Sequence, residues 1–341
     1  MQLADFQFDL PETLIAKYPA ARRSESRLLC LGEGEELVHR QFHQLIELVN
    51  PGDLLVVNDT SVIPARLFGQ KRTGGAVEIL VERVLDDQRI LAQVRVSKPP
   101  RVGDYLQFAP DIQLEVLGRI SHFYELRYAS TTKTILQVIE EIGHIPLPPY
   151  MHREADASDK ERYQTIYARL KGSVAAPTAG FHFDEALMQA LRAKGAEFGY
   201  LTLHIGAGTF APVRVDNIKE HQMHPEYLVV PTYLCEQVRA AKARGNRVIA
   251  VGTTSLRALE TACQSGEIEP YQGETSIFIY PGYTFRSADA LITNMHLPGS
   301  TLLMLVSAFS GHQRVMHAYR EAVRQAYHFY SYGDAMWMTR S

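Results

Sequence analysis

The sequence predicts an α/β protein in which a large α/β domain carries an inserted small antiparallel β-barrel domain. Three observations support this prediction. Residues 54–57 (LLVV) form a continuous apolar run between turn-forming residues, which is typical of a strand buried on both faces. Short apolar stretches recur at close spacing over 65–130, and strands alternate with helices in the rest of the chain. We expect a discontinuous α/β domain over 1–62 and 150–341 and a barrel domain over 63–149.

The predicted barrel strands are rich in Val, Ile, Leu and Tyr. Pairs of turn-forming residues separate them, such as Gly74-Gly75 and Pro99-Pro100. No helical pattern interrupts the series, so we expect a small antiparallel sheet closed on itself. The expected strands are 76–85, 89–97, 105–109, 112–120 and 123–129.

Helices with capping signals alternate with apolar strands in the second half of the chain. Asp184 can cap a helix, and Gly195 and Gly245 stand where two helices are expected to end. This alternation favours a partly parallel sheet covered by helices. The expected strands are 172–176, 198–205, 226–231, 247–252, 275–282 and 290–297, and the expected helices are 184–195, 233–246, 253–266 and 301–311.

The composition is that of an ordinary soluble globular chain. Of the 341 residues 46% are hydrophobic and 21% are charged, and the net charge of −3 neither indicates nor excludes a nucleic-acid partner. Cys30, Cys235 and Cys263 are too few and too widely spaced for a disulfide framework. The first residues lack a signal-peptide pattern, and no apolar run reaches the ~18 residues of a membrane span, so we expect a cytoplasmic protein.

Three strand-loop-helix junctions are candidate ligand sites: 173–186 (SVAAPTAGFHFDEA), 248–260 (VIAVGTTSLRALE) and 291–306 (LITNMHLPGSTLLMLV). In open α/β sheets, ligands bind beyond the carboxyl ends of strands, where helix N-termini present free N–H groups. Three such junctions can therefore line one crevice. Any single junction is weak evidence, because every α/β protein has several, and on spacing alone ordinary helix capping is the simpler interpretation of GTTSLR.

Several other residues have both a functional and a simpler interpretation. Gly208, in HIGAGTFAPV, permits a close approach to a ligand or merely a bend, and His204 can be a core residue. The segment 221–227 (HQMHPEY) lacks the H-E-x-x-H spacing, so no metal site is predicted, and Glu226 is instead available as a general base or as a partner for a positively charged ligand. A turn explains Asp59. Neither a G-x-G-x-x-G nor a P-loop pattern is present, so nucleoside triphosphate chemistry is not expected.

Basic residues outnumber acidic ones in the first part of the predicted barrel. Small barrels with such a surface can follow a phosphate backbone. The stretch 150–172 also mixes Lys, Arg and Tyr, which suits base stacking and phosphate contact. A solvated sheet face and an ordinary surface helix would show the same compositions. The RNA-binding candidates are Arg66, Lys71, Arg72 and Lys98.

The longer motifs resemble those of one family over nearly the whole chain. They include FDLPETLIAKYP, GDLLVVNDTSVIPARLFG, YQTIYA, GSVAAPTAGFHF, GTFAPV, VGTTSLRALE and ALITNMHLPGSTLLMLVSAFSG. These stretches resemble the S-adenosylmethionine:tRNA ribosyltransferase-isomerases of queuosine biosynthesis. Val57 and Met295 stand where that family has Phe, which exchanges one apolar side chain for another. The resemblance implies an α/β domain with an inserted β-barrel, as the pattern of elements does.

The resemblance also implies an activity. S-adenosylmethionine would serve as co-substrate and donate its ribosyl part, with no tightly bound cofactor. The acceptor would be the aminomethyl group of 7-aminomethyl-7-deazaguanine (preQ1) at the tRNA wobble position, and the products epoxyqueuosine in tRNA, adenine and methionine. We expect a monomer that uses neither a metal nor a membrane. The alternatives are a plain methyltransferase, which would show a Gly-rich loop after its first strand, and a non-catalytic tRNA-binding protein.

Roles follow from the reaction that the resemblance implies. It begins with loss of the adenine C8 proton and later expels adenine, so it needs a base and an acid. We expect His182, His204, Glu226 and Asp59 to do this work. Arg257 is expected to orient the donor carboxylate through a forked pair of hydrogen bonds. The segment 176–184 should form a pocket wall, with aromatic side chains on a nucleoside and His182 pointing inward. The substrate-binding candidates are Thr178, Gly180, Phe181, Gly208, Thr253, Thr254, Ser255, Arg257 and His296.

Overall fold

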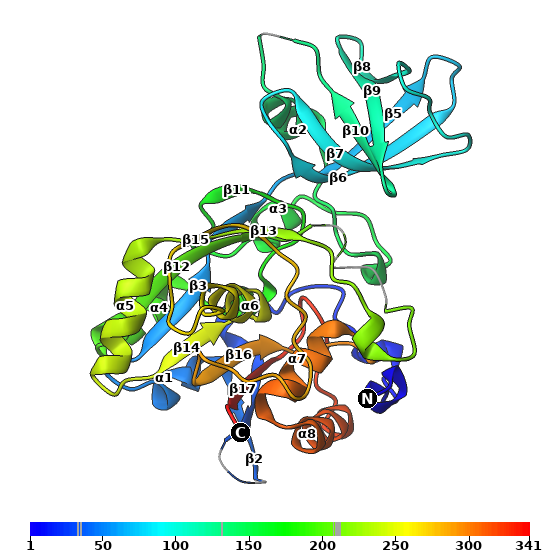
Figure 1. Cartoon of the computed structure of the whole chain (residues 1–341). Helices are drawn as coiled ribbons and strands as arrows, with labels where there is room; N and C mark the ends of the chain where they lie inside the picture. The colour runs from blue at the N-terminus through cyan, green and yellow to red at the C-terminus, as the bar shows by residue number, and fades with distance from the viewer. Residues whose placement is uncertain (33, 35, 131, 207, 209–212) are drawn as a thin grey trace.

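A large helix-covered sheet and a small closed barrel that projects from it make up the chain (Figure 1). The computed structural model describes residues 1–341 except 33, 35, 131, 207 and 209–212. The predicted fold class, α/β with an inserted antiparallel barrel, is confirmed. None of the helices in the described parts is both long and apolar enough to span a membrane.

Across the described residues, nine strands form one mixed sheet. The central strands β12, β3, β14 and β16 run parallel, as the continuous apolar runs of the sequence predict, and antiparallel pairs flank them. In spatial order the strands are β15 (Tyr271–Thr275), β13 (Glu226–Val230), β12 (Glu197–His204), β3 (Leu54–Asn58), β14 (Val248–Val251), β16 (Ala290–Asn294), β17 (Ala335–Thr339), β1 (Arg27–Leu31) and β2 (Leu37–Gln41).

Helices cover both faces of the sheet. In β3, Leu54 and Val56 pack into the core on one face, and Leu55 and Val57 pack into the core on the other, because successive side chains of a strand point to opposite sides. The first core is completed by α5 (Thr232–Ala243), α6 (Thr253–Ala262), α7 (Thr301–Ser310) and α8 (His312–Arg324), and the second by α1 (Leu45–Leu48) and α4 (Glu185–Ala193). The side chain of Asp184 caps α4 as expected.

The barrel has its own core and closes through antiparallel pairs between sequence neighbours, between β7 and β10 and between β5 and β8. Helix α2 (Ile135–Ile142), capped by Thr134, packs its buried residues against this core. In spatial order the strands are β10 (Phe123–Arg127), β7 (Arg89–Val96), β6 (Ala76–Val84), β5 (Arg66–Lys71), β8 (Tyr105–Ala109) and β9 (Ile112–Ile120).

Two short strands join the barrel to the large sheet. β4 (Thr60–Val62) leads into the barrel and β11 (Leu170–Ser173) follows it, and the two pair in parallel (Figure 1). The α-helix described in the stretch 150–172 is the single turn α3 (Asp159–Arg162), so this stretch is not an ordinary surface helix. The described 3₁₀ helices are Leu3–Phe6, Glu12–Leu14, Arg23–Glu25, Phe42–Gln44, Pro149–Met151, Thr178–His182 and Ile218–Glu220.

Two of the strands predicted from the sequence are wrong in position or extent. Residues 275–282 were expected to be extended and paired, but only Thr275 belongs to a strand, β15, which begins at Tyr271. The segment that follows packs onto the core without a β partner, and Ile279 is buried there. The strand expected over 172–176 ends at Ser173, and beyond it only Ala175 bridges to Ile205. Apolar side chains alone therefore do not distinguish a paired strand from an irregular buried segment.

Candidate active site

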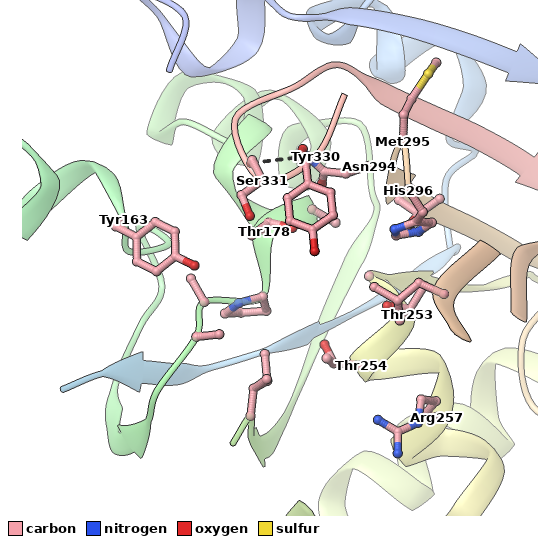
Figure 2. Close-up of a pocket in the computed structure, with 18 of the residues that line it drawn as sticks. Tyr163, Thr178, Thr253, Thr254, Arg257, Asn294, Met295, His296, Tyr330 and Ser331 are labelled. Atoms are coloured by element: carbon pink, nitrogen blue, oxygen red, sulfur yellow. Dashed lines mark hydrogen bonds between the residues drawn. The ribbon is translucent and has the colours of Figure 1, made fainter. Parts of the chain in front are cut away.

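The three predicted junctions meet in one pocket at the carboxyl ends of β14 and β16 (Figure 2). We call it the strand-end pocket. Figure 2 shows Thr253, Thr254 and Arg257 on one side and Tyr163 on the other, with the ring of Tyr330 between them. Its lining consists of Tyr163, 175–179, Ile205, Glu226, 252–254, Arg257, 293–296, Leu302, Tyr330 and Ser331.

The first turn of α6 forms one wall of the pocket. β14 turns into this helix through Gly252, whose φ of +92° favours glycine over any residue with a side chain. Thr253 and Thr254 follow and line the pocket, so free N–H groups of the helix start lie at its wall and favour an anionic ligand group. The hydroxyl of Ser255 instead donates to the Val251 carbonyl (2.8 Å) and lies outside the pocket lining.

A buried ion pair lies between the pocket and a neighbouring hollow. The Nη1 atom of Arg257, one turn further along α6, donates to the carboxylate of Glu226 at the start of β13. The Nε atom of Arg257 donates to the Ile277 carbonyl (3.3 Å), whereas its Nη2 atom has no hydrogen-bond partner among the described residues. Two of the five guanidinium N–H groups are thus used and those of Nη2 are left for a ligand, so the forked pair expected with the donor carboxylate stays a prediction.

The end of β16 supplies a neutral imidazole. His296 is buried, its Nε2 atom lies 2.8 Å from the Thr293 hydroxyl, and its backbone N–H donates to Tyr319. Burial lowers the pKa of His296 to about 3. The side chain therefore offers a neutral hydrogen-bonding group to the pocket at physiological pH.

The opposite rim contains a residue in an unusual backbone conformation. Tyr330 has a φ of +77°, and its backbone N–H donates to the Met295 carbonyl (2.9 Å). The Asn294 side chain donates to the carbonyl of Tyr330 (2.9 Å), which ties this rim to the end of β16. The tyrosine ring is thereby held against the pocket by contacts to its own backbone.

Of the segment 176–184, expected to form a pocket wall, residues 176–179 line the pocket, but His182 does not point into it. Its Nδ1 atom lies 2.7 Å from the Ser26 hydroxyl, and its ring packs against Phe42. Burial lowers the pKa of His182 to about 4, so the ring is neutral at physiological pH. Thr178 does line the pocket.

The neighbours of His182 pack behind the wall as well. Phe181 contacts the rings of Tyr163 and Tyr332 rather than the pocket. A Cβ on Gly180 would lie 2.1 Å from the hydroxyl of Tyr167, so this glycine permits tight packing. The aromatic side chains of the segment therefore support the pocket from outside instead of forming its surface.

Asp59 and His204 also lie outside the strand-end pocket. The buried carboxylate of Asp59 accepts hydrogen bonds from Arg169 (2.8 Å) and from the Thr202 hydroxyl (2.6 Å), which is a structural environment. His204 ends β12 with its Nδ1 atom 2.7 Å from the Thr60 hydroxyl, and burial lowers its pKa. It faces a hollow between the sheet and the barrel rather than the pocket.

The remaining candidates lie towards or on the barrel. Gly208 borders a small hollow beside His224, while the residues on both sides of it lie outside the described part of the chain. Arg66 borders a groove between barrel and sheet, and Lys71 donates to the Lys98 carbonyl (2.8 Å). Arg72 and Lys98 are exposed on the barrel. Within the described residues, no three His, Cys, Asp or Glu side chains are arranged to hold a metal ion.

Several lining residues were not anticipated as site residues. Tyr163 stands in the motif YQTIYA, whose length and order already single it out. Tyr330 and Ser331 lie in the aromatic-rich stretch YHFYSY, near the end of the chain and far from the three junctions. Only the fold brings that stretch to the pocket, so no local pattern indicates it.

The chain belongs to the family of queuosine biosynthesis proteins, because the model of that family matches residues 3–338. Among solved structures it is similar to the S-adenosylmethionine tRNA ribosyltransferase from Thermotoga maritima. The identity is 36%, the match covers 98% of this chain and 99% of that chain, and the TM-score is 0.57. The family resemblance seen in the motifs is thereby confirmed.

Proposed function

We infer that this protein transfers and isomerises the ribosyl moiety of S-adenosylmethionine onto the preQ1 base at the tRNA wobble position. The products are epoxyqueuosine in tRNA, adenine and methionine. Family membership over residues 3–338 and similarity to an S-adenosylmethionine tRNA ribosyltransferase over 98% of the chain support this activity. The observation that carries the inference is the strand-end pocket, in which three separate family motifs meet.

We place S-adenosylmethionine in the strand-end pocket. Its carboxylate matches the remaining N–H side of Arg257 and the first turn of α6, which both favour an anion. Its sulfonium matches the rings of Tyr163 and Tyr330, since cations bind favourably against aromatic faces. Donors for the carboxylate and rings for the cation thus lie on different sides of one cavity (Figure 2).

Among the four acid/base candidates, Glu226 is the one that lines this pocket. We propose it as the base for the adenine C8 proton, with Arg257 holding its carboxylate in place. His296 supplies a neutral imidazole that can exchange hydrogen bonds with the leaving adenine. His182 and Asp59 support the surrounding walls instead.

We also propose that the two parts of the chain bind different substrates. The α/β part, 1–62 with 150–341, holds the donor, and the inserted part, 63–149, contacts the RNA. Arg66, Lys71, Arg72 and Lys98 of the inserted part supply positive charge for phosphates, which predicts tRNA binding that weakens with salt. The enzyme works as a monomer in the cytoplasm.

The test is the reaction with S-adenosylmethionine and an anticodon stem-loop that carries preQ1, followed by measurement of free adenine and of the RNA mass. Adenine release with the mass of one cyclised ribosyl unit added is the expected result. A methyl-sized gain would indicate methyl transfer, and binding without product would indicate an RNA-binding protein. A stem-loop with guanine in place of preQ1 is the matched control and should give no product.

A further inference from the structure

A groove runs between the barrel and the large sheet, and we call it the junction groove. One arm is bordered by Arg66 and His122 of the barrel and by Arg214 beyond β12. The other arm is bordered by Lys171 of β11 and by His204 of β12. A small hollow adjoins the first arm at His221 and His224. This hollow and the second arm are both bordered by Glu82, Gly206 and Glu226, and we call these three residues the centre of the groove.

Glu82 is the barrel's contribution to this centre. In the pairing of β6 with β7, Val81 lies opposite Ala92 and Arg83 lies opposite Leu91, so Glu82 is the extra residue of a β-bulge. Bulges change the direction of a side chain and are frequent beside active sites. Glu82 is only 7% exposed, and a Cβ on Gly206 would lie 2.0 Å from its Oε1 atom. Its carboxylate therefore faces the large sheet across the groove.

The centre of the groove adjoins the strand-end pocket. Glu226, Arg257 and Leu302 line both the pocket and the hollow that Glu82 borders. The Nη2 atom of Arg257 is buried and lacks a hydrogen-bond partner among the described residues, as expected where a ligand completes the site. A base that enters from the groove would thus reach the donor while touching the barrel.

We propose that Glu82 is a catalytic residue that binds the aminomethyl group of the acceptor base and takes its proton. This inference rests on the proposed function. A primary amine is an ammonium at neutral pH, since its pKa is about 10, and a partly desolvated carboxylate is a suitable partner for it. In the step, an N–H bond of the ammonium breaks and an O–H bond forms on Glu82. The freed nitrogen lone pair then forms the new C–N bond to the ribosyl carbon, while the bond from that carbon to adenine breaks and its electron pair leaves with adenine.

The charges around Glu82 are compatible with this role. Lys171, His204, His221, His224, Arg257 and Glu226 border the same hollows, while Arg83 and Glu274 at the rim pair with each other. Burial lowers the pKa of both His204 and His221, which favours neutral rings. The barrel would then have a second task besides phosphate contact, because it supplies a group that acts only when the RNA is in place.

The test compares wild type, Glu82→Gln and Glu82→Asp on two stem-loops, one with the aminomethyl group and one with a neutral hydroxymethyl group in its place. Loss of a general base predicts a fall in kcat of ~10²-fold or more for Glu82→Gln at neutral pH. Its rate should then rise about tenfold per pH unit up to about pH 9, because the fraction of neutral amine rises, whereas the wild-type rate should not. Glu82→Asp should recover part of the activity.

Binding supplies an independent measurement that survives loss of turnover. Wild type should bind the aminomethyl stem-loop more tightly than the hydroxymethyl one, and Glu82→Gln should bind both equally, which is the non-additive result expected of groups in contact. Glu115→Gln is the matched control, because this barrel glutamate pairs with Arg127 and lines none of the hollows described. It should behave as wild type.

Full turnover by Glu82→Gln, or an unchanged preference for the aminomethyl group, would overturn the proposal. If Glu82→Gln does not fold, the proposal is tested with wild type and with Glu82→Asp. Equal binding of both stem-loops by wild type would then overturn the proposal. A wild-type enzyme that releases no adenine would instead refute the proposed function, so the two failures are distinguishable.

Discussion

Acidification is expected to destabilise the fold through two buried imidazoles, His182 and His296. Burial lowers their pKa values from 6.5 to about 4 and about 3. Above pH 6.5 both rings are neutral in the folded and unfolded states, so neither affects stability. Below that pH the unfolded chain binds protons that the folded chain refuses, and the free energy of unfolding falls by about 1.4 kcal/mol per pH unit and per histidine. At about pH 5 the loss is about 2 kcal/mol each and about 4 kcal/mol together.

Urea unfolding at about pH 7.5, 6 and 5 measures this loss, and variants isolate it from the other titrating groups. His296→Gln should lower the free energy of unfolding at neutral pH. It should also reduce by about one the number of protons that the chain takes up on unfolding at acidic pH, so that stability depends less steeply on pH, and His182→Gln should do the same. His43→Gln, at an exposed position, is the control and should leave the slope unchanged. An unaltered slope in both buried variants would refute the argument that these rings stay neutral in the fold.

Three other substitutions test the site. Gly206→Ala should remove most turnover with little loss of stability, because its Cβ would displace the movable end of Glu82; kcat and circular dichroism together check this. Arg257→Met removes the guanidinium from the buried carboxylate of Glu226 and should cost about 3–5 kcal/mol in urea unfolding, part of which a second change, Glu226→Gln, should restore. Asp59→Asn should lower stability by about 1–3 kcal/mol with kcat nearly unchanged; a loss of kcat alone would make Asp59 a catalytic candidate again.

Much of the fold follows from local patterns in the sequence. The run 54–57 becomes β3, whose two faces are both buried, and Asp184 and Gly195 mark the ends of α4 as capping rules predict. The failures occur where pairing partners decide the outcome. The apolar segment 276–282 finds no neighbouring strand, while the polar stretch Tyr271–Thr275 pairs with β13. No property of either stretch alone indicates which of them lies beside an open sheet edge.

The candidate site was predictable where strand-loop-helix geometry fixes side-chain direction. Thr178, Thr253 and Arg257 line the pocket for that reason. His182 does not, because its ring turns to Ser26, a partner 156 residues away. Long-range contacts of this kind determine which way a loop side chain points, and sequence spacing contains no information about them.

The position of β17 in the large sheet implies that the two parts of the chain fold at different times during synthesis. The barrel strands pair with one another within residues 66–127, and α2 and the bridge between Arg66 and His144 complete the barrel, so it can form as soon as the chain up to about residue 144 has left the ribosome. β17 instead lies between β16 and β1, so the large sheet stays incomplete until residue 339 has been made. Until then β1 lacks its parallel neighbour, and an unpaired apolar strand in an incomplete chain is prone to aggregation. The barrel is therefore expected to fold before the sheet that holds the pocket exists.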